Sequence, residues 1–164
     1  MKMTVMFALF FIIGTAVAKA VHGDSVVGTW RLVAYEDRPA QGPSRFPYGE
    51  TPQGLLVYDA HGHMSLQIMK TPHPKVASSN DEKITAAEKV ALFDSYTAYY
   101  GKYWVDEDRR VVTHHVEADM ADVYIGRDEE RPYEVHNGRL TLKPKWTVNG
   151  KTWEGVRVFE RIGD

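Results

Sequence analysis

Short runs in which hydrophobic and polar residues alternate recur along most of this chain. A period of two places successive side chains on opposite faces of a β-strand. The clearest example lies at residues 101–118, where two segments rich in aromatic and β-branched residues flank the charged turn Asp106–Arg110. This stretch predicts a β-hairpin at the centre of the chain.

The same pattern predicts further strands on both sides of that hairpin. On the first of them, Trp30, Leu32 and Ala34 share one face, and Arg31, Val33 and Tyr35 share the other. Two Asn-Gly pairs later in the chain are typical of two-residue hairpin turns. The strands expected outside the central hairpin are Val26–Glu36, Gly54–Tyr58, Met64–Met69, Glu129–Val135, Arg139–Lys143, Lys145–Val148 and Thr152–Arg161.

One helix is predicted between the third and fourth strands. Thr85 and Glu88 have the spacing of a capping box, in which each side chain bonds the other's backbone N–H. Downstream apolar and aromatic residues follow a helical period and predict an inward stripe that ends at Gly101. The members of that stripe are Val90, Phe93, Thr97 and Tyr100.

About eight strands with hairpin connections predict an all-β fold, a single antiparallel eight-stranded β-barrel with one helix between strands 3 and 4. Eight strands enclose room for one small ligand. The segment Asp37–Pro52 contains four prolines and is expected to be a loop. It is either a lid or rim loop of the barrel, or a plain connection.

The first twenty residues have the pattern of a secretory signal peptide. Lys2 is followed by the apolar run Val5–Ile13 and then by small residues that allow cleavage after Ala18 or Ala20. The alternative is an uncleaved membrane anchor, for which the apolar run is short. We expect residues 1–20 to be a signal peptide, residues 21–164 to be the barrel domain, and the protein to be secreted or periplasmic.

Composition supports a folded exported protein without cross-links. Hydrophobic residues make up 43% of the chain, too many for a disordered protein. There is no cysteine, so the chain has no disulfide and no lipid-modifiable cysteine near the cleavage site. The formal net charge of −2 is too mild to indicate nucleic acid as a partner. We expect no stable membrane insertion after signal cleavage.

Several short segments, in this order and spacing, resemble the bacterial and fungal lipocalin-like domain family. The resemblance covers about Val26–Arg161 and implies a small calycin-like barrel with a ligand-sized cavity. It implies little about chemistry, since some such barrels bind apolar molecules and others resemble cyclases or isomerases. The segments that carry it are Gly28–Val33, Pro52–Tyr58, His61–Met69, Tyr99–Tyr103, Val112–Glu117, Leu140–Leu142 and Phe159–Arg161.

Alternation indicates which side chains face the interior. His114 shares the more apolar face of its strand with Val112 and Val116, and Arg131 and Tyr133 oppose a more solvated face. A buried arginine needs a partner, either a carboxylate of the protein or one of a ligand. The candidates for ligand binding in the cavity are Trp30, Tyr103, His114, Arg131 and Tyr133.

Each candidate also has a purely structural interpretation. His114 either hydrogen-bonds within the core or contacts a ligand and transfers protons. Arg131 is either a structural ion pair or a ligand clamp, and Trp30 either packs or closes the barrel floor. Tyr103 and Tyr133 each offer an apolar body with a polar tip, which suits core and cavity equally.

Metal and cofactor chemistry receives little support. Adjacent His114 and His115 point to opposite faces of a strand, and His61 and His63 flank a turn glycine. No hydrolase elbow or phosphate loop is present in the sequence. We expect no metal and no cofactor, and we assign no catalytic residue.

Three functions remain open. The first is an exported protein that holds a small apolar or amphipathic, mainly apolar, ligand in the barrel. The second is a cofactor-independent isomerase or cyclase, with His114 and a tyrosine as acid–base groups. The third is a barrel filled by its own aromatic side chains, with a structural or interaction role.

Overall fold

The computed structural model describes residues 25–163. The predicted signal peptide and its cleavage site lie outside this range. Within it the chain forms nine strands, one α-helix and one 3-10 turn. These are β1 (Gly28–Pro39), β2 (Gln53–Tyr58), β3 (His63–Met69), the 3-10 turn Asp81–Lys83, α1 (Ala86–Asp94), β4 (Tyr96–Asp106), β5 (Val111–Asp119), β6 (Asp128–His136), β7 (Arg139–Leu142), β8 (Lys145–Val148) and β9 (Lys151–Ile162).

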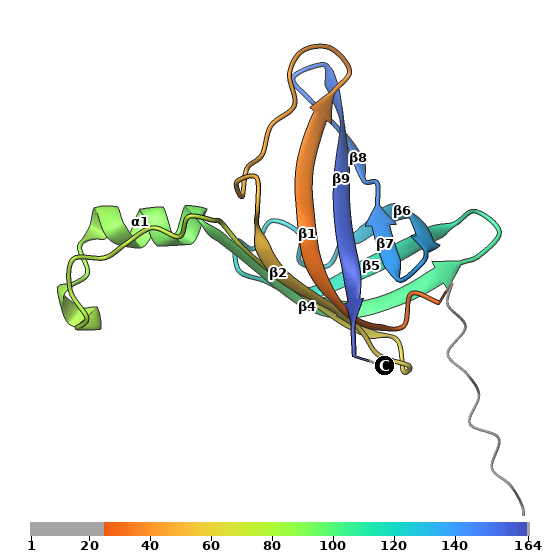
Figure 1. Ribbon diagram of the computed structural model, residues 1–164, viewed down its shortest axis with the longest axis horizontal. Coiled ribbons are helices and arrows are strands. Elements are labelled where there is room, and N and C mark those ends of the chain that lie inside the picture. The colour runs from red at the N-terminus through yellow and green to blue at the C-terminus, as the bar shows by residue number, and fades with distance from the viewer. Residues whose placement is uncertain (1–24, 164) are drawn as a thin grey trace, which may run out of the picture.

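Eight of these strands close into a barrel (Figure 1). Every pairing is antiparallel, and β1 pairs with both β2 and β9, which joins the two edges of the sheet. β8 pairs only with the first part of β9 and forms a hairpin with it. The predicted fold is therefore confirmed, including the position of the helix between β3 and β4.

Both Asn-Gly pairs form the tight turns that the sequence predicts. Asn137 and Gly138 have φ of 50° and 71°, and Asn149 and Gly150 have φ of 50° and 70°. Two successive positive φ values are what a type I′ hairpin turn requires, and asparagine and glycine tolerate them best. These turns set the β6–β7 and β8–β9 registers.

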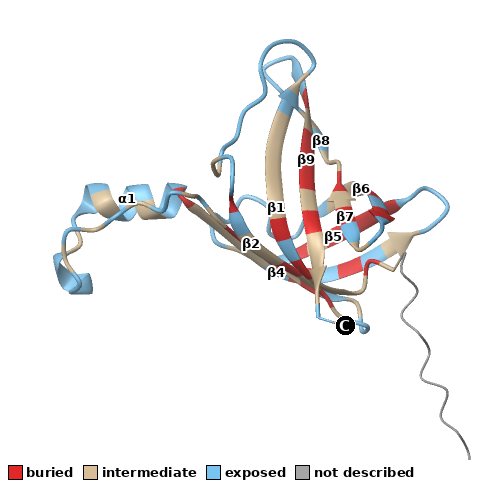
Figure 2. Ribbon diagram, viewed as in Figure 1, coloured by how far each residue is buried: buried red, intermediate tan, exposed pale blue. Residues whose placement is uncertain are grey.

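One end of the barrel, which we call the floor, is packed solid. Trp30 is fully buried, and its Nε1 donates to the carbonyl of Val26 at 2.7 Å. The Arg161 guanidinium lies 4.0 Å from the Trp30 ring centre and donates to the carbonyls of Val27 and Ser25, each at 2.6 Å. Figure 2 shows the buried residues concentrated on the barrel strands.

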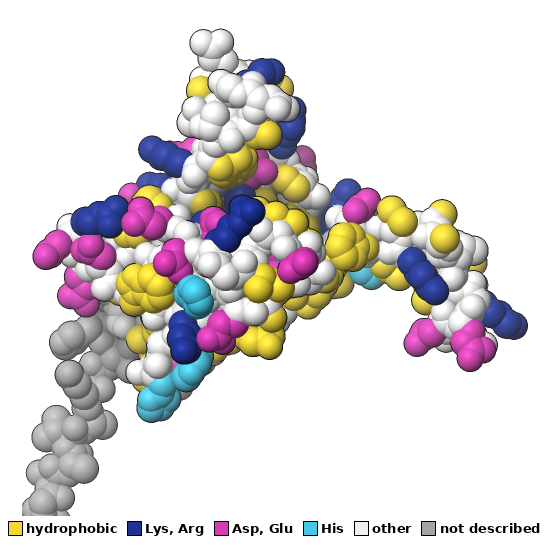
Figure 3. Space-filling view, turned by 180° about the vertical axis from the view of Figure 1, so that it is seen from behind, with side chains coloured by type: hydrophobic (Ala, Val, Ile, Leu, Met, Phe, Trp, Pro, Cys, Tyr) yellow, Lys and Arg dark blue, Asp and Glu magenta, His cyan; other side chains and the backbone are white. Residues whose placement is uncertain are grey.

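The predicted inward stripe of the helix is wrong. α1 ends at Asp94, and Val90 and Phe93 on it are 60% and 50% exposed. Thr97 and Tyr100 lie on β4, where they pair with β3. The segment after Ser95 is rich in tyrosine and threonine, so pairing with β3 overrode the helical spacing. The arm that carries α1 projects away from the barrel, and its hydrophobic side chains are visible in Figure 3.

Gly101 lies within β4 and does not end a helix. A Cβ atom there would collide with the backbone oxygen of His115 on β5. The β4–β5 register shifts at this point, between Tyr100 and Gly101. Glycine is therefore required because the two backbones approach closely at a bulge.

Candidate functional site

A cavity of about 500 Å³ occupies the end of the barrel opposite the floor. Its wall is contributed by most of the strands and by three loops, so it is the lumen itself. Its lining residues are Tyr35, Asp37, Tyr48, Leu66, Ile68, Thr97, Tyr99, Val116, Tyr124, Arg127, Glu129, Arg131, Leu142, Pro144, Lys145, Trp146, Arg157 and Phe159. The wall combines aliphatic and aromatic side chains with a few charged groups, as small-molecule sites usually do.

The loop between β1 and β2 forms part of the rim of this cavity. Its Tyr48 lines the cavity and packs edge-on against Tyr35, with ring centres 4.8 Å apart. A backbone bridge between Asp37 and Arg45 ties the loop back to β1. The proline-rich segment thus holds an aromatic side chain over the mouth.

One arginine at the mouth is fully engaged with its own neighbours. Arg157 donates to the Asp37 carboxylate and to the backbone oxygen of Glu36, each at 2.5 Å. Its guanidinium also lies 3.4 Å from the ring centre of Tyr35. Burial raises the pKa of the Tyr35 hydroxyl to about 12, although the charge of Arg157 opposes the rise. Tyr35 therefore stays protonated.

Arg131 is less completely engaged. Its Nη1 donates to the Glu129 carboxylate and to the backbone oxygen of Glu130, both at 3.3 Å. These contacts are long for charge-assisted hydrogen bonds. Burial alone would lower the pKa of the Arg131 guanidinium, but the Tyr99 hydroxyl and the Glu129 carboxylate raise it. Arg131 carries its positive charge into the cavity.

His114 is completely buried between two tyrosines. Its Nε2 lies 2.5 Å from the Tyr58 hydroxyl oxygen and its Nδ1 lies 2.8 Å from the Tyr99 hydroxyl oxygen. Burial, and after it the positive charge of Arg131, hold the pKa of His114 well below the ordinary 6.5. The imidazole is therefore neutral near pH 7. Because Tyr99 lines the cavity, this chain of polar groups connects the core with the lumen.

The five candidate residues fall into different places. Arg131 lines the cavity, and His114 lies one side chain behind it through Tyr99. Trp30 and Tyr103 belong to the buried cluster, and the Tyr103 hydroxyl donates to the Asp59 carbonyl at 2.5 Å. Tyr133 is also in that cluster and does not line the cavity. Ligand contact by any of them stays a prediction.

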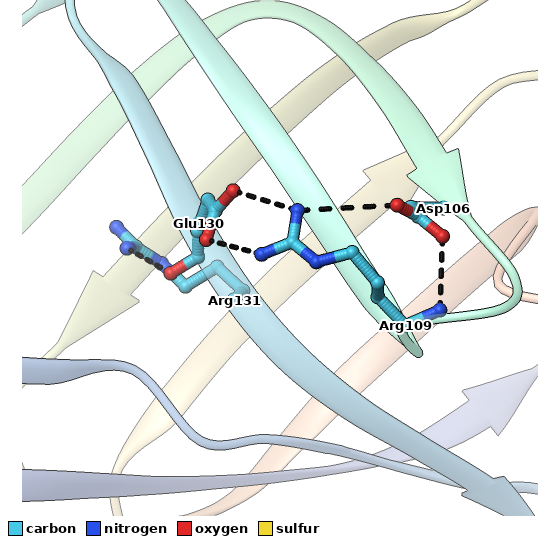
Figure 4. A network of polar contacts seen from close by, with 4 residues as sticks. All are labelled: Asp106, Arg109, Glu130 and Arg131. Carbon is cyan, nitrogen blue, oxygen red and sulfur yellow. Dashed lines mark hydrogen bonds and ion pairs between the residues drawn. The ribbon is translucent and has the colours of Figure 1, made fainter.

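Tyr133 lines a second, open hollow at the floor end. This hollow measures about 620 Å³ and lies between the β4–β5 turn, β6 and the end of β7. Figure 4 shows the outer network beside it: Arg109 makes two hydrogen bonds with Glu130, at 3.1 and 3.2 Å, and also pairs with Asp106. Arg131 points away from this network. The hollow lacks aromatic walls on several sides, so the lumen is the better candidate site.

The sequence reasoning missed much of the cavity. Tyr35 was assigned to the face opposite Trp30, yet it lines the lumen, as does Asp37. The β1–β9 register shifts between Leu32 and Ala34, and such a bulge exchanges the two faces beyond it. No residue between 26 and 36 signals the bulge. Trp146 and Arg157 on β8 and β9 were also missed.

The histidines outside the barrel interior serve local contacts. Asp59 accepts from the backbone of His61 and His63, and the Nδ1 of His63 lies 3.0 Å from its carboxylate. His115 contacts Asp128 at 2.7 Å. Within residues 25–163, no three histidine, aspartate or glutamate side chains are grouped to hold a metal ion. No helix in the same range is long and apolar enough to cross a membrane.

The closed barrel, its solid floor and its open cavity define a protein of the small ligand-binding barrel type. A family model for the lipocalin-like domain matches residues 27–160, so the chain belongs to the lipocalin-like domain family. No curated protein and no solved structure gave a significant match. The expected family is thereby confirmed.

Proposed function

We propose that this protein is exported and holds a small, mainly apolar molecule in the upper half of the barrel. The observation that carries the proposal is the 500 Å³ cavity, which lies above a solid floor and is lined from most of the strands. Aliphatic side chains form its depth, and Tyr35, Tyr48 and Trp146 supply flat aromatic surfaces near its mouth. Burial of apolar ligand surface against such walls supplies the binding free energy.

Export rests on the sequence of residues 1–20. The positive start, the apolar run and the small residues before Ala20 support removal of this segment during secretion. N-terminal sequencing of the protein recovered from the medium or periplasm tests it. A mature chain that starts after Ala18 or Ala20 is expected, and an intact Met1 in a membrane fraction would contradict export.

Native mass spectrometry of the secreted, purified protein, followed by denaturing extraction, tests the binding function. We expect an additional mass on the folded protein that is released on unfolding. A bare protein that also shows no thermal shift across a panel of fatty acids, aromatic acids and their alcohols would contradict ligand binding. That result would favour a structural or interaction role for the barrel.

A second candidate function is a cofactor-independent isomerase or cyclase. It is favoured by one observation, the chain Tyr58–His114–Tyr99, which carries exchangeable protons to the cavity wall. In that case Tyr99 acts as the acid or base toward a bound substrate, and His114 exchanges the proton behind it. Chemical change of the extracted ligand by wild-type protein, lost in Tyr99→Phe with binding retained, would distinguish catalysis from binding alone.

A further inference from the structure

The polar corner of the cavity can be examined by counting hydrogens. Tyr58, His114 and Tyr99 form a row with two hydrogen-bond contacts, at 2.5 and 2.8 Å. A neutral imidazole contributes one N–H and each tyrosine contributes one O–H, which makes three hydrogens for two contacts. One hydrogen must therefore point outside the row.

Burial decides which hydrogen that is. Tyr58 is only 1% exposed, and its hydroxyl has no hydrogen bond within residues 25–163 other than that with His114. A donor left unpaired at that depth is costly. Tyr58 therefore donates to Nε2, and the imidazole hydrogen sits on Nδ1 and is donated to the Tyr99 oxygen. The hydroxyl hydrogen of Tyr99 is left to point into the cavity, whose wall Tyr99 forms.

Arg131 stands beside this hydroxyl. The positive charge of the guanidinium acts directly on Tyr99 and opposes the effect of burial on the Tyr99 pKa. Both hydrogen bonds of Arg131 to strand oxygens leave from Nη1, so its Nη2 and Nε hydrogens bond no carboxylate or carbonyl of the described residues. The corner thus offers donors from two side chains and a positive charge, and arginine has no acceptor.

The other cations of the lining are differently placed. Arg157 is held by Asp37 and the Glu36 carbonyl, and Lys145 pairs with Glu154 at 3.3 Å. Arg127 is exposed at the rim. Four cationic and only two acidic side chains line the cavity, so its charge balance also favours an anion.

We propose that the ligand is a carboxylic acid with a flat, apolar body, whose carboxylate is bound by Arg131 and the Tyr99 hydroxyl. This inference rests on the proposed binding function and names the class of its ligand. The aromatic side chains above the corner hold the body, and His114 fixes Tyr99 as a donor. The nearby Glu129 carboxylate weakens the site for anions because it shares Arg131 with the ligand.

The binding test uses 2-naphthoic acid and 2-naphthalenemethanol, which differ only in the acidic group, with titration calorimetry at pH 7. We expect the acid to bind wild-type protein about tenfold or more tighter, since a hydrogen bond to a charged group is worth that much. Arg131→Met should remove the preference and leave the alcohol unchanged. Tyr99→Phe should weaken the acid about fivefold, and Glu129→Gln should strengthen it.

Matched controls come from the outer face of the same strands. Tyr100→Phe changes the exposed neighbour of Tyr99, and Arg139→Met removes an exposed arginine at the floor end. Neither should alter the preference for the acid. Equal affinity for acid and alcohol, or an equal loss of both in Arg131→Met, would overturn the carboxylate assignment and leave ligand binding intact. Failure of both probes to bind would overturn the binding function together with this inference.

The hydrogen count has a test that needs no substitution. Nitrogen-15 NMR of the imidazole distinguishes a protonated from an unprotonated ring nitrogen. We expect the hydrogen of His114 on Nδ1 in the free wild-type protein. A hydrogen on Nε2 would turn the Tyr99 hydroxyl toward the imidazole and overturn its role as a donor to the ligand.

Discussion

The two ends of the barrel each place an arginine inside, and the two arginines are used differently. At the floor, Arg161 lies on the ring of Trp30 and bonds two backbone carbonyls at 2.6 Å. At the cavity, Arg131 has only Nη1 contacts, both at 3.3 Å. A guanidinium with all its nearby acceptors paired stabilises the fold, whereas one with unused donors can bind something else.

The largest expected effect lies at the floor. Trp30→Ala should lower the free energy of unfolding by about 3–5 kcal/mol, because it leaves a cavity where a fully buried ring was. Denaturant unfolding followed by circular dichroism measures the loss. Trp104→Ala, which removes a 48% exposed ring on the outside of β4, is the control and should cost less than about 1 kcal/mol. Equal losses would mean that the floor is not the stable end.

The two arginines can be compared directly. Arg161→Met should cost about 2–3 kcal/mol, since the carbonyls of Val27 and Ser25 lose a charged donor. Arg131→Met should change stability by less than about 1 kcal/mol, because its ion pair with Glu129 is long and partly exposed. Thermal unfolding of both variants in one buffer makes the comparison. A reversed order would remove the distinction between a structural and a ligand-binding arginine.

His114 adds a pH dependence to the cavity end that the floor lacks. Its pKa in the folded protein lies well below the 6.5 of the unfolded chain, so only the unfolded chain takes up the proton as the pH falls below about 6.5. Stability is therefore complete above that value and should fall by up to about 1.4 kcal/mol per pH unit below it.

Unfolding measured between pH 7 and 5 checks this slope. His114→Gln should flatten it, since glutamine can still donate and accept between two hydroxyls but does not titrate. His61→Gln, at an exposed turn, should leave the slope unchanged. A slope that persists in His114→Gln would assign the proton uptake to another group.

The smallest expected effect separates the two tyrosines that contact His114. Tyr58→Phe should cost about 1–2 kcal/mol, because it leaves Nε2 of His114 without a donor in a dry core. Tyr99→Phe should cost less than about 1 kcal/mol, because water in the cavity can replace its oxygen. Denaturant midpoints of the two variants decide it. A larger loss for Tyr99→Phe would place the buried end of the row at the wrong tyrosine.

Most of the fold could be predicted because its signals are local. Alternation along β5 and β6 was enough to turn His114 and Arg131 inward, and the Asn-Gly pairs gave two of the hairpin turns. The helix boundary failed because residues 96–100 fit both a helical and a strand period, and only pairing with β3 decides between them.

The candidate site was predictable only in part because it depends on contacts between distant strands. The bulge after Leu32 turns Tyr35 and Asp37 into the lumen without any local sign in the sequence. The row Tyr58–His114–Tyr99 joins β2, β5 and β4, so its hydrogen count is visible only once three strands are in place. Alternation gives the face of a residue but not its neighbour.

The pairing of β1 with β9 has a consequence for how the chain is made. The residues that close the barrel, among them Trp30 and Arg161, stand at opposite ends of the described sequence. A ribosome delivers β9 last, so the floor cannot form until nearly the whole chain has been synthesised. Contacts so distant in sequence also slow folding. The nascent protein therefore stays unlocked throughout translation, and its final strand acts as the bolt.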